Sequence, residues 1–300
     1  RKWSLLVGGR LDKHNLVDHV IFSPRVNVRF NPSEAVNLRV SYAGGYRAPQ
    51  AFDEDMHIAI VGGKRVRIRL ADDLREERSH SVSLSADLYH TFGKVQTNLL
   101  VEGFYTILDD VFALRDMDDA ADGGKVKERY NGSGATVRGF NVEGRAAFTR
   151  WFELQAGVTL QQSRYKEPEF WSEDAEVPPV RRMFRTPDAY GYFTASFKPV
   201  RNFTADLSGT CTGSMLVQHM AGSGVAQDVA VSTPSFFDMN IRLSYDVRIY
   251  KEITMQLYGG VQNLFNAYQK DFDKGVDRDS GYIYGPSLPR SWFVGAKFSF

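Results

Sequence analysis

The sequence predicts an all-β fold, namely an antiparallel up-and-down transmembrane β-barrel, with about twelve of its strands in this chain. Three observations predict this fold. Apolar and polar residues alternate with a period of two along most of the chain. Short connections alternate with long ones, and the polar face of the strands carries charges that a dry protein core does not accept.

The alternation is clearest in the last segment, where Trp292, Val294, Ala296, Phe298 and Phe300 share one face of an extended strand. Segments with this pattern lie near residues 2–12, 22–31, 35–46, 78–91, 95–108, 134–149, 151–165, 187–198, 202–217, 236–249, 253–266 and 289–300. Most of them exceed the roughly 5 to 6 residues of a typical strand in a soluble sheet. A helical period is absent, so we expect little helix.

The connections between these segments alternate in length. Short ones lie at residues 31–34, 91–94, 150 and 199–201, and long ones lie near 47–77, 109–133, 166–186, 218–235 and 267–288. Tight turns at one end and large loops at the other are typical of an outer-membrane barrel, whereas a soluble sandwich mixes its loop lengths. If the first segment runs outward, the long connections are extracellular. The basic run at residues 64–69 is expected to form a loop hairpin.

The two faces of the strands differ in the environment they require. Along residues 236–249, Ile241 and Leu243 belong to the apolar row, whereas Asp238, Arg242 and Asp246 belong to the polar row. A closed barrel places the apolar row in lipid and the polar row in a wet lumen. Aromatic residues near strand ends fit girdles at the two membrane interfaces; they are Tyr42, Tyr46, Tyr89, Tyr105, Trp151, Tyr192, Tyr250 and Trp292.

Composition excludes several other classes of protein. With 37 basic and 36 acidic residues the net charge is +1, so nothing draws the chain towards nucleic acid. The single cysteine, Cys211, excludes an internal disulfide and a cysteine-based metal cage. The six histidines are scattered, and we find no nucleophile–base pair, nucleotide loop or metal motif. We therefore expect no enzyme, no metal site and no intrinsic cofactor.

Several stretches resemble TonB-dependent outer-membrane receptors. The segment 23–54 is similar to a barrel strand of that family that ends in an aromatic–Arg-Ala-Pro box, which here consists of Tyr46, Arg47, Ala48 and Pro49. The segment 71–90 resembles the loop exit and the strand that follow in the family. Residues 130–148 and 260–272, the latter including Asn263, resemble later strands, and the end at Phe300 is similar to the final one. Together these matches cover nearly the whole chain in the family's order. Two positions depart from the family pattern. Ala71 stands where the family carries Asn, and Arg75-Glu76 stands where it carries Pro-Glu.

The resemblance implies a 22-stranded barrel filled by a plug. Residues 1–300 would then be the C-terminal part of that barrel, and the plug domain and the first strands would be absent from this chain. The expected partners are outer-membrane lipid, the rest of the barrel, TonB acting through the absent plug, and a surface lipoprotein. The expected location is the bacterial outer membrane. The alternatives are a passive pore or structural barrel without energy coupling, and a soluble β-sandwich or propeller.

The resemblance also implies uptake of a scarce solute, such as a siderophore, haem or another metal chelate, or cobalamin. His57 lies where some haem-uptake members carry a histidine, with Asp53 and Asp55 nearby as possible cation contacts; equally, all three fit an ordinary surface loop. Arg181 and Arg182 would attract an anionic chelate, or would be solvated loop charges. The aromatic–Arg-Ala-Pro box points to structure, since Pro49 removes a donor from the strand ladder.

Overall fold

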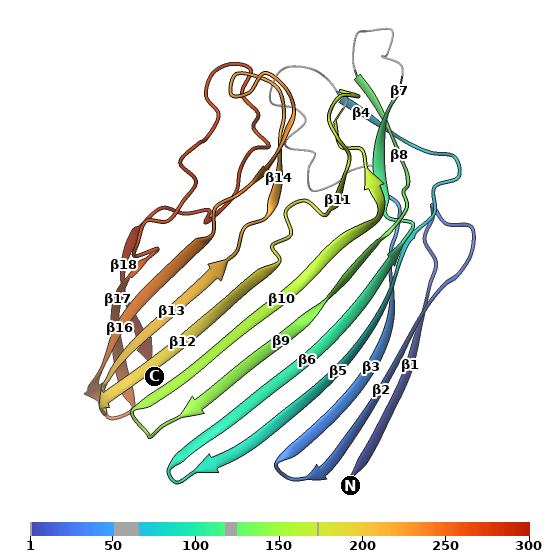
Figure 1. Cartoon of the computed structure of the whole chain (residues 1–300). Helices are drawn as coiled ribbons and strands as arrows, with labels where there is room; N and C mark the ends of the chain where they lie inside the picture. The colour runs from blue at the N-terminus through green and yellow to red at the C-terminus, as the bar shows by residue number, and fades with distance from the viewer. Residues whose placement is uncertain (1, 51–65, 118–124, 173) are drawn as a thin grey trace.

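Strands that are neighbours in the sequence are neighbours in space, and together they form one curved antiparallel sheet (Figure 1). A computed structural model describes residues 2–50, 66–117, 125–172 and 174–300. The sheet runs in the order β1 (Trp3–Asp12), β2 (Ile21–Ser33), β3 (Val36–Arg47), β5 (Glu77–Phe92), β6 (Val95–Asp109), β9 (Ala135–Ala147), β10 (Phe152–Glu169), β12 (Ala189–Val200), β13 (Phe203–Thr212), β16 (Phe236–Tyr250), β17 (Ile253–Gln262) and β18 (Ser291–Ser299). Within the described ranges no helix is long and apolar enough to cross a bilayer.

The predicted strand segments and the predicted antiparallel order are confirmed. Two segments end earlier than predicted. Residues 253–266 leave the ladder after Gln262 because Asn263 adopts a positive φ of 49°, which an asparagine tolerates in a turn. Residues 202–217 leave the sheet after Thr212, and Leu216 begins a separate strand above it.

Tight turns join the strands at the end of the sheet where both chain termini lie, at the bottom of Figure 1. The turn between β5 and β6 contains only Gly93 and Lys94, and Gly93 has a φ of 61°, which glycine adopts without steric cost. Lys251 has a φ of 43° in the equally short turn between β16 and β17. Most of the connections at the opposite end are long, as the alternation of connection lengths predicted.

The strand register keeps apolar residues beside apolar residues on one face. Val40 pairs with Val28 and with Leu84, and Ile241 lies between its neighbours on β13 and β17 in the same way. No second layer covers this face in the described part of the chain, since 61 % of Leu84 and 44 % of Leu243 remain exposed. This face is therefore uncovered, as the predicted lipid-facing side of a barrel would be.

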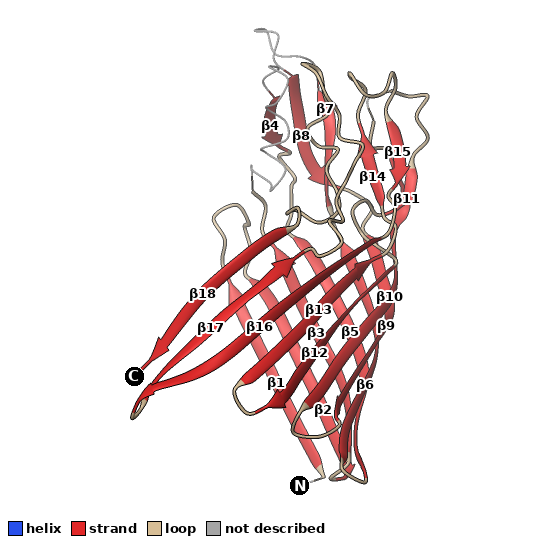
Figure 2. Ribbon diagram, turned by 90° about the vertical axis from the view of Figure 1, so that its left-hand side faces the viewer, coloured by secondary structure: helices blue, strands red, loops and turns tan. Residues whose placement is uncertain are grey.

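The other face carries polar side chains that bond to one another across strands. The amide nitrogen of Asn141 on β9 donates to Glu102 Oε2 on β6 at 3.1 Å. Thr159 Oγ1 on β10 donates to Asn141 Oδ1 at 2.9 Å. Such a chain of hydrogen bonds fits a wall that borders water. The sheet is curved (Figure 2), and a barrel closed with this face inside would have a polar lumen.

Additional short strands form a layer of loops above the sheet (Figure 2). A three-stranded sheet has the order β4 (Val66–Leu70), β8 (Lys125–Asn131) and β7 (Phe112–Met117), and β14 (Leu216–His219) pairs with β15 (Val229–Ser232). β11 (Val180–Arg182) pairs with the upper part of β10. The predicted loop hairpin at 64–69 is wrong for residues 66–69, which the structure describes. These residues belong to β4, which pairs in parallel with β8 from a distant connection.

The sheet does not close on itself in the described part of the chain. β1 and β18 are the two ends of the strand order, and each pairs on one side only. The side chains of β1 are exposed along almost its whole length, and 90 % of Val294 on β18 is exposed. Both edges therefore present free backbone donors and acceptors, which sheets normally protect.

Candidate functional site

Two parts of the molecule carry the features of a binding site. One is the loop layer above the sheet, and the other is the polar wall of the lumen below it. Most of the fully buried residues lie in or next to the loop layer, including Arg129, Glu76, Val217 and Gln269. The loop layer therefore has defined packing of its own.

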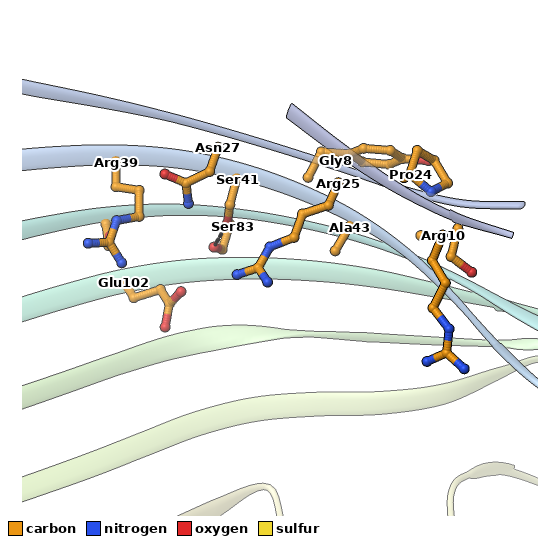
Figure 3. A pocket seen from close by; sticks show the side chains of 15 residues that line it. Gly8, Arg10, Pro24, Arg25, Asn27, Arg39, Ser41, Ala43, Ser83 and Glu102 are labelled. Atoms are coloured by element: carbon orange, nitrogen blue, oxygen red, sulfur yellow. Dashed lines mark hydrogen bonds between the residues drawn. The ribbon is translucent and has the colours of Figure 1, made fainter. Parts of the chain in front are cut away.

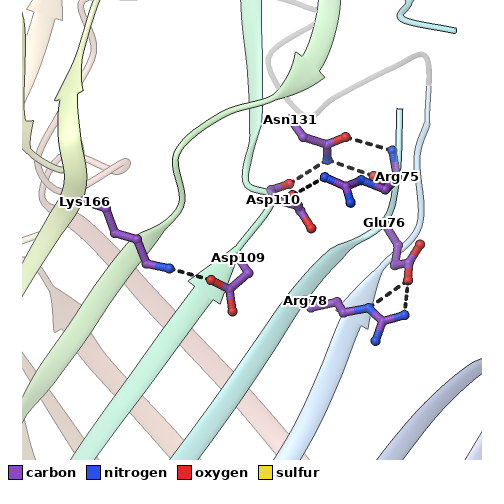
Figure 4. Close-up of polar contacts among 7 residues, drawn as sticks. All are labelled: Arg75, Glu76, Arg78, Asp109, Asp110, Asn131 and Lys166. Carbon is purple, nitrogen blue, oxygen red and sulfur yellow. Dashed lines mark hydrogen bonds and ion pairs between the residues drawn. The ribbon is translucent and has the colours of Figure 1, made fainter. Parts of the chain in front are cut away.

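The first loop cluster is centred on Asn131 at the end of β8 (Figure 4). Its side-chain nitrogen donates to the carbonyl oxygens of Asp110 at 2.8 Å and Arg75 at 3.0 Å. Its side-chain oxygen accepts from the backbone nitrogen of Arg75 at 2.8 Å, and Arg75 Nη2 contacts Asp110 Oδ1 at 3.0 Å. One amide side chain thus holds together segments that precede β5, follow β6 and end β8.

Glu76, beside this cluster, is almost fully buried. Its Oε1 accepts from Arg78 Nη2 at 2.6 Å and lies 3.0 Å from His19 Nε2. Burial raises the pKa of Glu76, but the hydrogen bonds from Arg78 and His19 outweigh this effect, and the pKa lies below its ordinary value. The connection between β1 and β2 is thereby tied to the start of β5.

The second loop cluster joins the β14–β15 hairpin to the connection between β17 and β18. His219 Nε2 lies 2.9 Å from Asp273 Oδ1, and its ring stacks on Tyr282 with centroids 3.7 Å apart. The hydroxyls of Tyr282 and Tyr284 both donate to Asp271. Four of these residues come from the loop between β17 and β18, and two of them, Asp273 and Tyr282, contact His219 from the other loop.

Burial and the hydrogen bonds to Asp271 raise the pKa of Tyr282 and of Tyr284. Burial raises the pKa of Asp271 as well, but the two phenol donors outweigh it, so its pKa lies below the ordinary value. Arg185 Nη1 adds a hydrogen bond to the carbonyl of Ile283 at 2.8 Å, which ties in the connection before β12. The cluster holds its loops in one arrangement.

The lumen wall contains a cavity of about 610 Å³ on the polar face of β1, β2, β3, β5 and β6 (Figure 3). Arg10, Arg25 and Arg39 extend into it from three successive strands, and Glu102 faces them from β6. A volume of this size falls within the usual range for small-molecule sites. The cavity is the clearest candidate for a solute site on the wall.

Of the predicted ligand-binding residues, Arg181 and Arg182 are described by the structure, and they lie apart from this cavity. His57, Asp53 and Asp55 fall outside the described residues. Arg182 donates to the Ser214 carbonyl at 2.9 Å and pairs with Asp188 at 3.1 Å, so it fastens β11 to its surroundings. Arg181, next to it, is exposed.

The predicted motif residues occupy strand ends. Tyr46 and Arg47 end β3, Ala48 follows, and Pro49 is almost fully buried just beyond the strand. Arg47 Nη1 lies 3.6 Å from Glu77 Oε2, its register neighbour on β5.

Asn263, which follows β17, accepts from the Ala267 backbone nitrogen at 2.8 Å and donates to the Leu288 carbonyl at 2.9 Å. Phe300, the last residue, follows β18 and is 92 % exposed.

Reasoning from the sequence missed the residues that organise the loops. Asn131 is a polar residue in a polar loop, and nothing in its local sequence distinguishes it. The stretch Gly281–Gly285 with its two tyrosines carried a signal, because paired aromatic residues in a loop predict local packing. The lumen arginines were visible as residues of the polar row, but their common position on the wall required the register.

Comparison with known proteins agrees with this architecture. The family described as "TonB dependent receptor-like, beta-barrel" matches residues 2–264. The siderophore receptor PirA of Acinetobacter baumannii has a similar structure, with a TM-score of 0.66 and 16% identity over 100% of this chain and 44% of its own. No curated protein matches the sequence.

Two further solved structures are similar. The ferric enterobactin receptor PfeA of Pseudomonas aeruginosa, in its G324V form, has a TM-score of 0.65 at 17% identity over 98% of this chain and 42% of its own. The ferric-catecholate import receptor Fiu of K12 E. coli has a TM-score of 0.60 at 16% identity over 93% and 35%. This chain thus spans about two fifths of the length of these receptors.

The predicted family and fold are confirmed by these matches. Members of the family are transporters of the outer membrane of Gram-negative bacteria, and they are not enzymes. Three observations agree with this assignment. The family matches most of the chain, the single-layer sheet has one apolar and one polar face, and the loop layer lies at one end. This chain belongs to the TonB-dependent receptor family, and its strands are strands of that family's barrel.

Proposed function

We propose that residues 1–300 form the C-terminal part of the barrel of a receptor that binds a metal chelate at the cell surface and imports it. The import is driven by TonB acting on a plug domain that lies outside this chain. The observation that carries the proposal is the open sheet. β1 and β18 are unpaired at their outer edges in the described residues, although every strand between them has two neighbours.

Further strands that pair with β1 and β18 would complete the barrel. A 22-stranded barrel has a lumen wide enough for a plug domain, and the polar wall described above would line it. A twelve-stranded passive pore is not favoured, because it requires β1 to pair with β18, and these strands are not paired in the described part.

A metal chelate is the solute class that the similar structures support. PirA is a siderophore receptor, PfeA is a ferric enterobactin receptor and Fiu is a ferric-catecholate import receptor. The loop layer, held in place by the Asn131 and Asp271 clusters, is the surface on which such a chelate first binds. A surface lipoprotein is a further candidate partner of the loop layer.

Uptake of radiolabelled iron chelates by cells that express the intact receptor tests the proposal. We expect binding to whole cells in the presence or absence of TonB, and accumulation only when TonB is present. Accumulation that continues without TonB would mean a passive pore. Absence of binding for every iron chelate tried, from a receptor that is present in the outer membrane, would refute the proposed solute class.

A further inference from the structure

We propose that Arg138 and Arg164, on the uncovered apolar face of the sheet, bind the phosphate headgroup of an anionic membrane lipid in the leaflet next to the loop layer. This inference goes beyond the proposed function, because it concerns the lipid around the barrel and no step of chelate import. The two arginines lie on β9 and β10, in the middle of the strand order. Strands that pair with β1 and β18 would therefore not cover them.

The apolar row of the two strands ends at one level. Its last members are Phe140 on β9 and Leu160 on β10, which are register partners and are 64 % and 56 % exposed. Two residues closer to the loop layer, the same row continues with Arg138 on β9 and Gln162 on β10, which also pair with each other. Arg164 follows on β10. The uncovered face thus changes from apolar to cationic within one step of the pleat.

The height of the apolar row places this change at the level of the lipid headgroups. At roughly 3.3 Å per residue and a strand tilt of about 40°, the row from Phe152 to Leu160 is about 20 Å tall. The apolar band of a transmembrane barrel is about 25 Å tall, so the residues just beyond Leu160 lie at its border. Tyr105 on β6, the other register partner of Arg138, is exposed on the same face, and tyrosine is enriched at this level.

Two cations at this border have no carboxylate partner in the described part of the chain. Arg138 donates from Nε and Nη2 to the neutral Gln162 Oε1 at 3.2 and 2.8 Å. Arg164 forms no hydrogen bond or ion pair with a described residue. It lies opposite Arg182 on β11, whose own charge is paired with Asp188. Two guanidinium charges are therefore left without a counterion.

The two guanidinium groups can reach one phosphate. Because Arg164 lies two residues beyond Gln162, the register partner of Arg138, the two arginines are diagonal neighbours. Residues in such positions are about 7–8 Å apart, which two long side chains can bridge through a shared ligand. Arg138 is exposed and Arg164 is half-buried. Each guanidinium can donate two hydrogen bonds to phosphate oxygens.

The surroundings favour a lipid as the source of the phosphate. Lys166, the next residue of the row on β10, is paired with Asp109 at 2.5 Å, and Arg78 on β5 is paired with Glu76 at 2.6 Å (Figure 4). These two carboxylates are each taken by one cation, so the surplus charge is positive. The surplus adjoins a face that acyl chains would cover. A molecule that carries both a phosphate and acyl chains matches both features.

The test measures lipid binding to the intact receptor in neutral detergent by native mass spectrometry. The probes are phosphatidic acid and phosphatidylcholine with the same acyl chains, titrated separately. We expect the wild type to bind phosphatidic acid more tightly. Arg138→Gln combined with Arg164→Gln should weaken the binding of phosphatidic acid by about fivefold per arginine and leave the binding of phosphatidylcholine unchanged.

The matched control, Arg145→Gln combined with Arg242→Gln, removes the same charge from the polar face, where both arginines have partners. It should change the affinity for phosphatidic acid by less than about twofold, because these charges are distant and screened. Arg138→Lys combined with Arg164→Lys keeps the charge without the planar fork, and it should recover part of the lost affinity.

A variant that should gain affinity separates the site from a general loss of folding. Asp109→Asn removes the carboxylate that is paired with Lys166, so a third cation becomes available two residues from Arg164. The affinity for phosphatidic acid should rise by about twofold to fivefold. Adding Lys166→Gln to Asp109→Asn should abolish this gain.

Equal affinity of the wild type for the two lipids would overturn the proposal. So would an unchanged affinity for phosphatidic acid after the loss of Arg138 and Arg164, or an equal loss in the polar-face control. Inorganic phosphate in large excess should displace no more lipid than potassium chloride of the same ionic strength; specific displacement would mean a site for a free anion. No chelate takes part, so failure of this test and failure of chelate uptake are distinguishable.

Discussion

The sheet and the loop layer are built on different principles. In the sheet, one rule is repeated along every strand, because apolar residues such as Val40 and Leu84 meet their like across the ladder while polar residues meet on the other face. In the loop layer, no such repeat exists. Single side chains hold the loops in place: Asn131 bonds two other segments, and Asp271 accepts from two tyrosines of its own loop.

This difference determines how each region responds to substitution. Apart from glycines in close contact with a neighbouring strand, such as Gly139 and Gly260, a residue of the sheet should be interchangeable with others of the same polarity, because the face on which it lies is what is fixed. A residue of the loop clusters is fixed by its hydrogen bonds, and a substitute of similar polarity does not restore them. The effect of a substitution on stability should therefore depend on the face of the sheet in the strands, and on the individual hydrogen bond that is lost in the loops.

The largest effect is expected from a charge on the lipid face of the sheet. Val101 on β6 lies between Ala86 and Val142, whereas its neighbour Leu100 lies between Asp87 and Glu143 on the lumen face. Val101→Arg should destabilise the folded barrel by about 2–4 kcal/mol, the usual effect near the bilayer midplane. Leu100→Arg, the same change one residue earlier, gains two carboxylate neighbours and should stay within about 0.5 kcal/mol.

Denaturant titration of the receptor in lipid vesicles, followed by tryptophan fluorescence, measures both variants. If the two arginine variants lose stability equally, the assignment of one face to lipid and the other to the lumen is wrong. If Leu100→Arg is the more destabilising, the two faces have been exchanged.

The sheet could be predicted from the sequence because its rule is local. Alternation along residues 78–91 or 95–108 identifies a strand and its two faces without knowledge of any partner. The alternation of connection lengths then gives the antiparallel order. Only details escaped, such as the end of β17, where the positive φ of Asn263 stops the ladder inside a segment that still looked regular.

The loop contacts and the lumen site could not be predicted, because they depend on residues that are far apart in the chain. His219 and Asp273 are separated by 54 residues, and Asn131 reaches back 56 residues to Arg75. The position of Arg25 between Gly8 and Ala43 on the wall of the cavity depends on the exact register of β1, β2 and β3, and a shift of one residue would place its side chain on the other face.

A smaller effect is expected in the loop layer, where it should remain local. Gln269 is buried and bonds the backbone of the tyrosine loop at two points, donating to the Tyr282 carbonyl at 3.0 Å and accepting from the Tyr284 nitrogen at 2.9 Å. Gln269→Met leaves both backbone groups buried without partners. The free energy of local opening of residues 263–290 should fall by about 1–3 kcal/mol.

Hydrogen exchange read by mass spectrometry measures this change. Exchange of the Tyr284 amide should accelerate, whereas amides in β17 should keep their protection. Gln262→Met is the matched control, because Gln262 is exposed and only accepts a 3.3 Å bond from Ser291 Oγ; it should change little. Equal loss of protection in loop and sheet would show that the two regions unfold together.

The smallest effect is expected from the pH, and it concerns the same loop. The hydrogen bonds from Tyr282 and Tyr284 hold the pKa of Asp271 below its ordinary value of about 3.9. A lowered folded-state pKa means that the stabilisation is fully present above the unfolded value and is lost as the pH falls through the folded value. Protection of residues 263–290 from exchange, corrected for the intrinsic rate, should therefore be constant from about pH 6 to pH 5 and decline below about pH 4.

Asp271→Asn isolates the contribution of this carboxyl group from that of the rest of the loop. The variant should start with lower protection and lose less of it on acidification, because an amide does not titrate in this range. Asp277→Asn changes an exposed carboxylate of the same loop and should follow the wild type. If Asp271→Asn declines as steeply as the wild type, the acid sensitivity does not come from Asp271, and the tyrosine–carboxylate contact holds the loop less firmly than its geometry indicates.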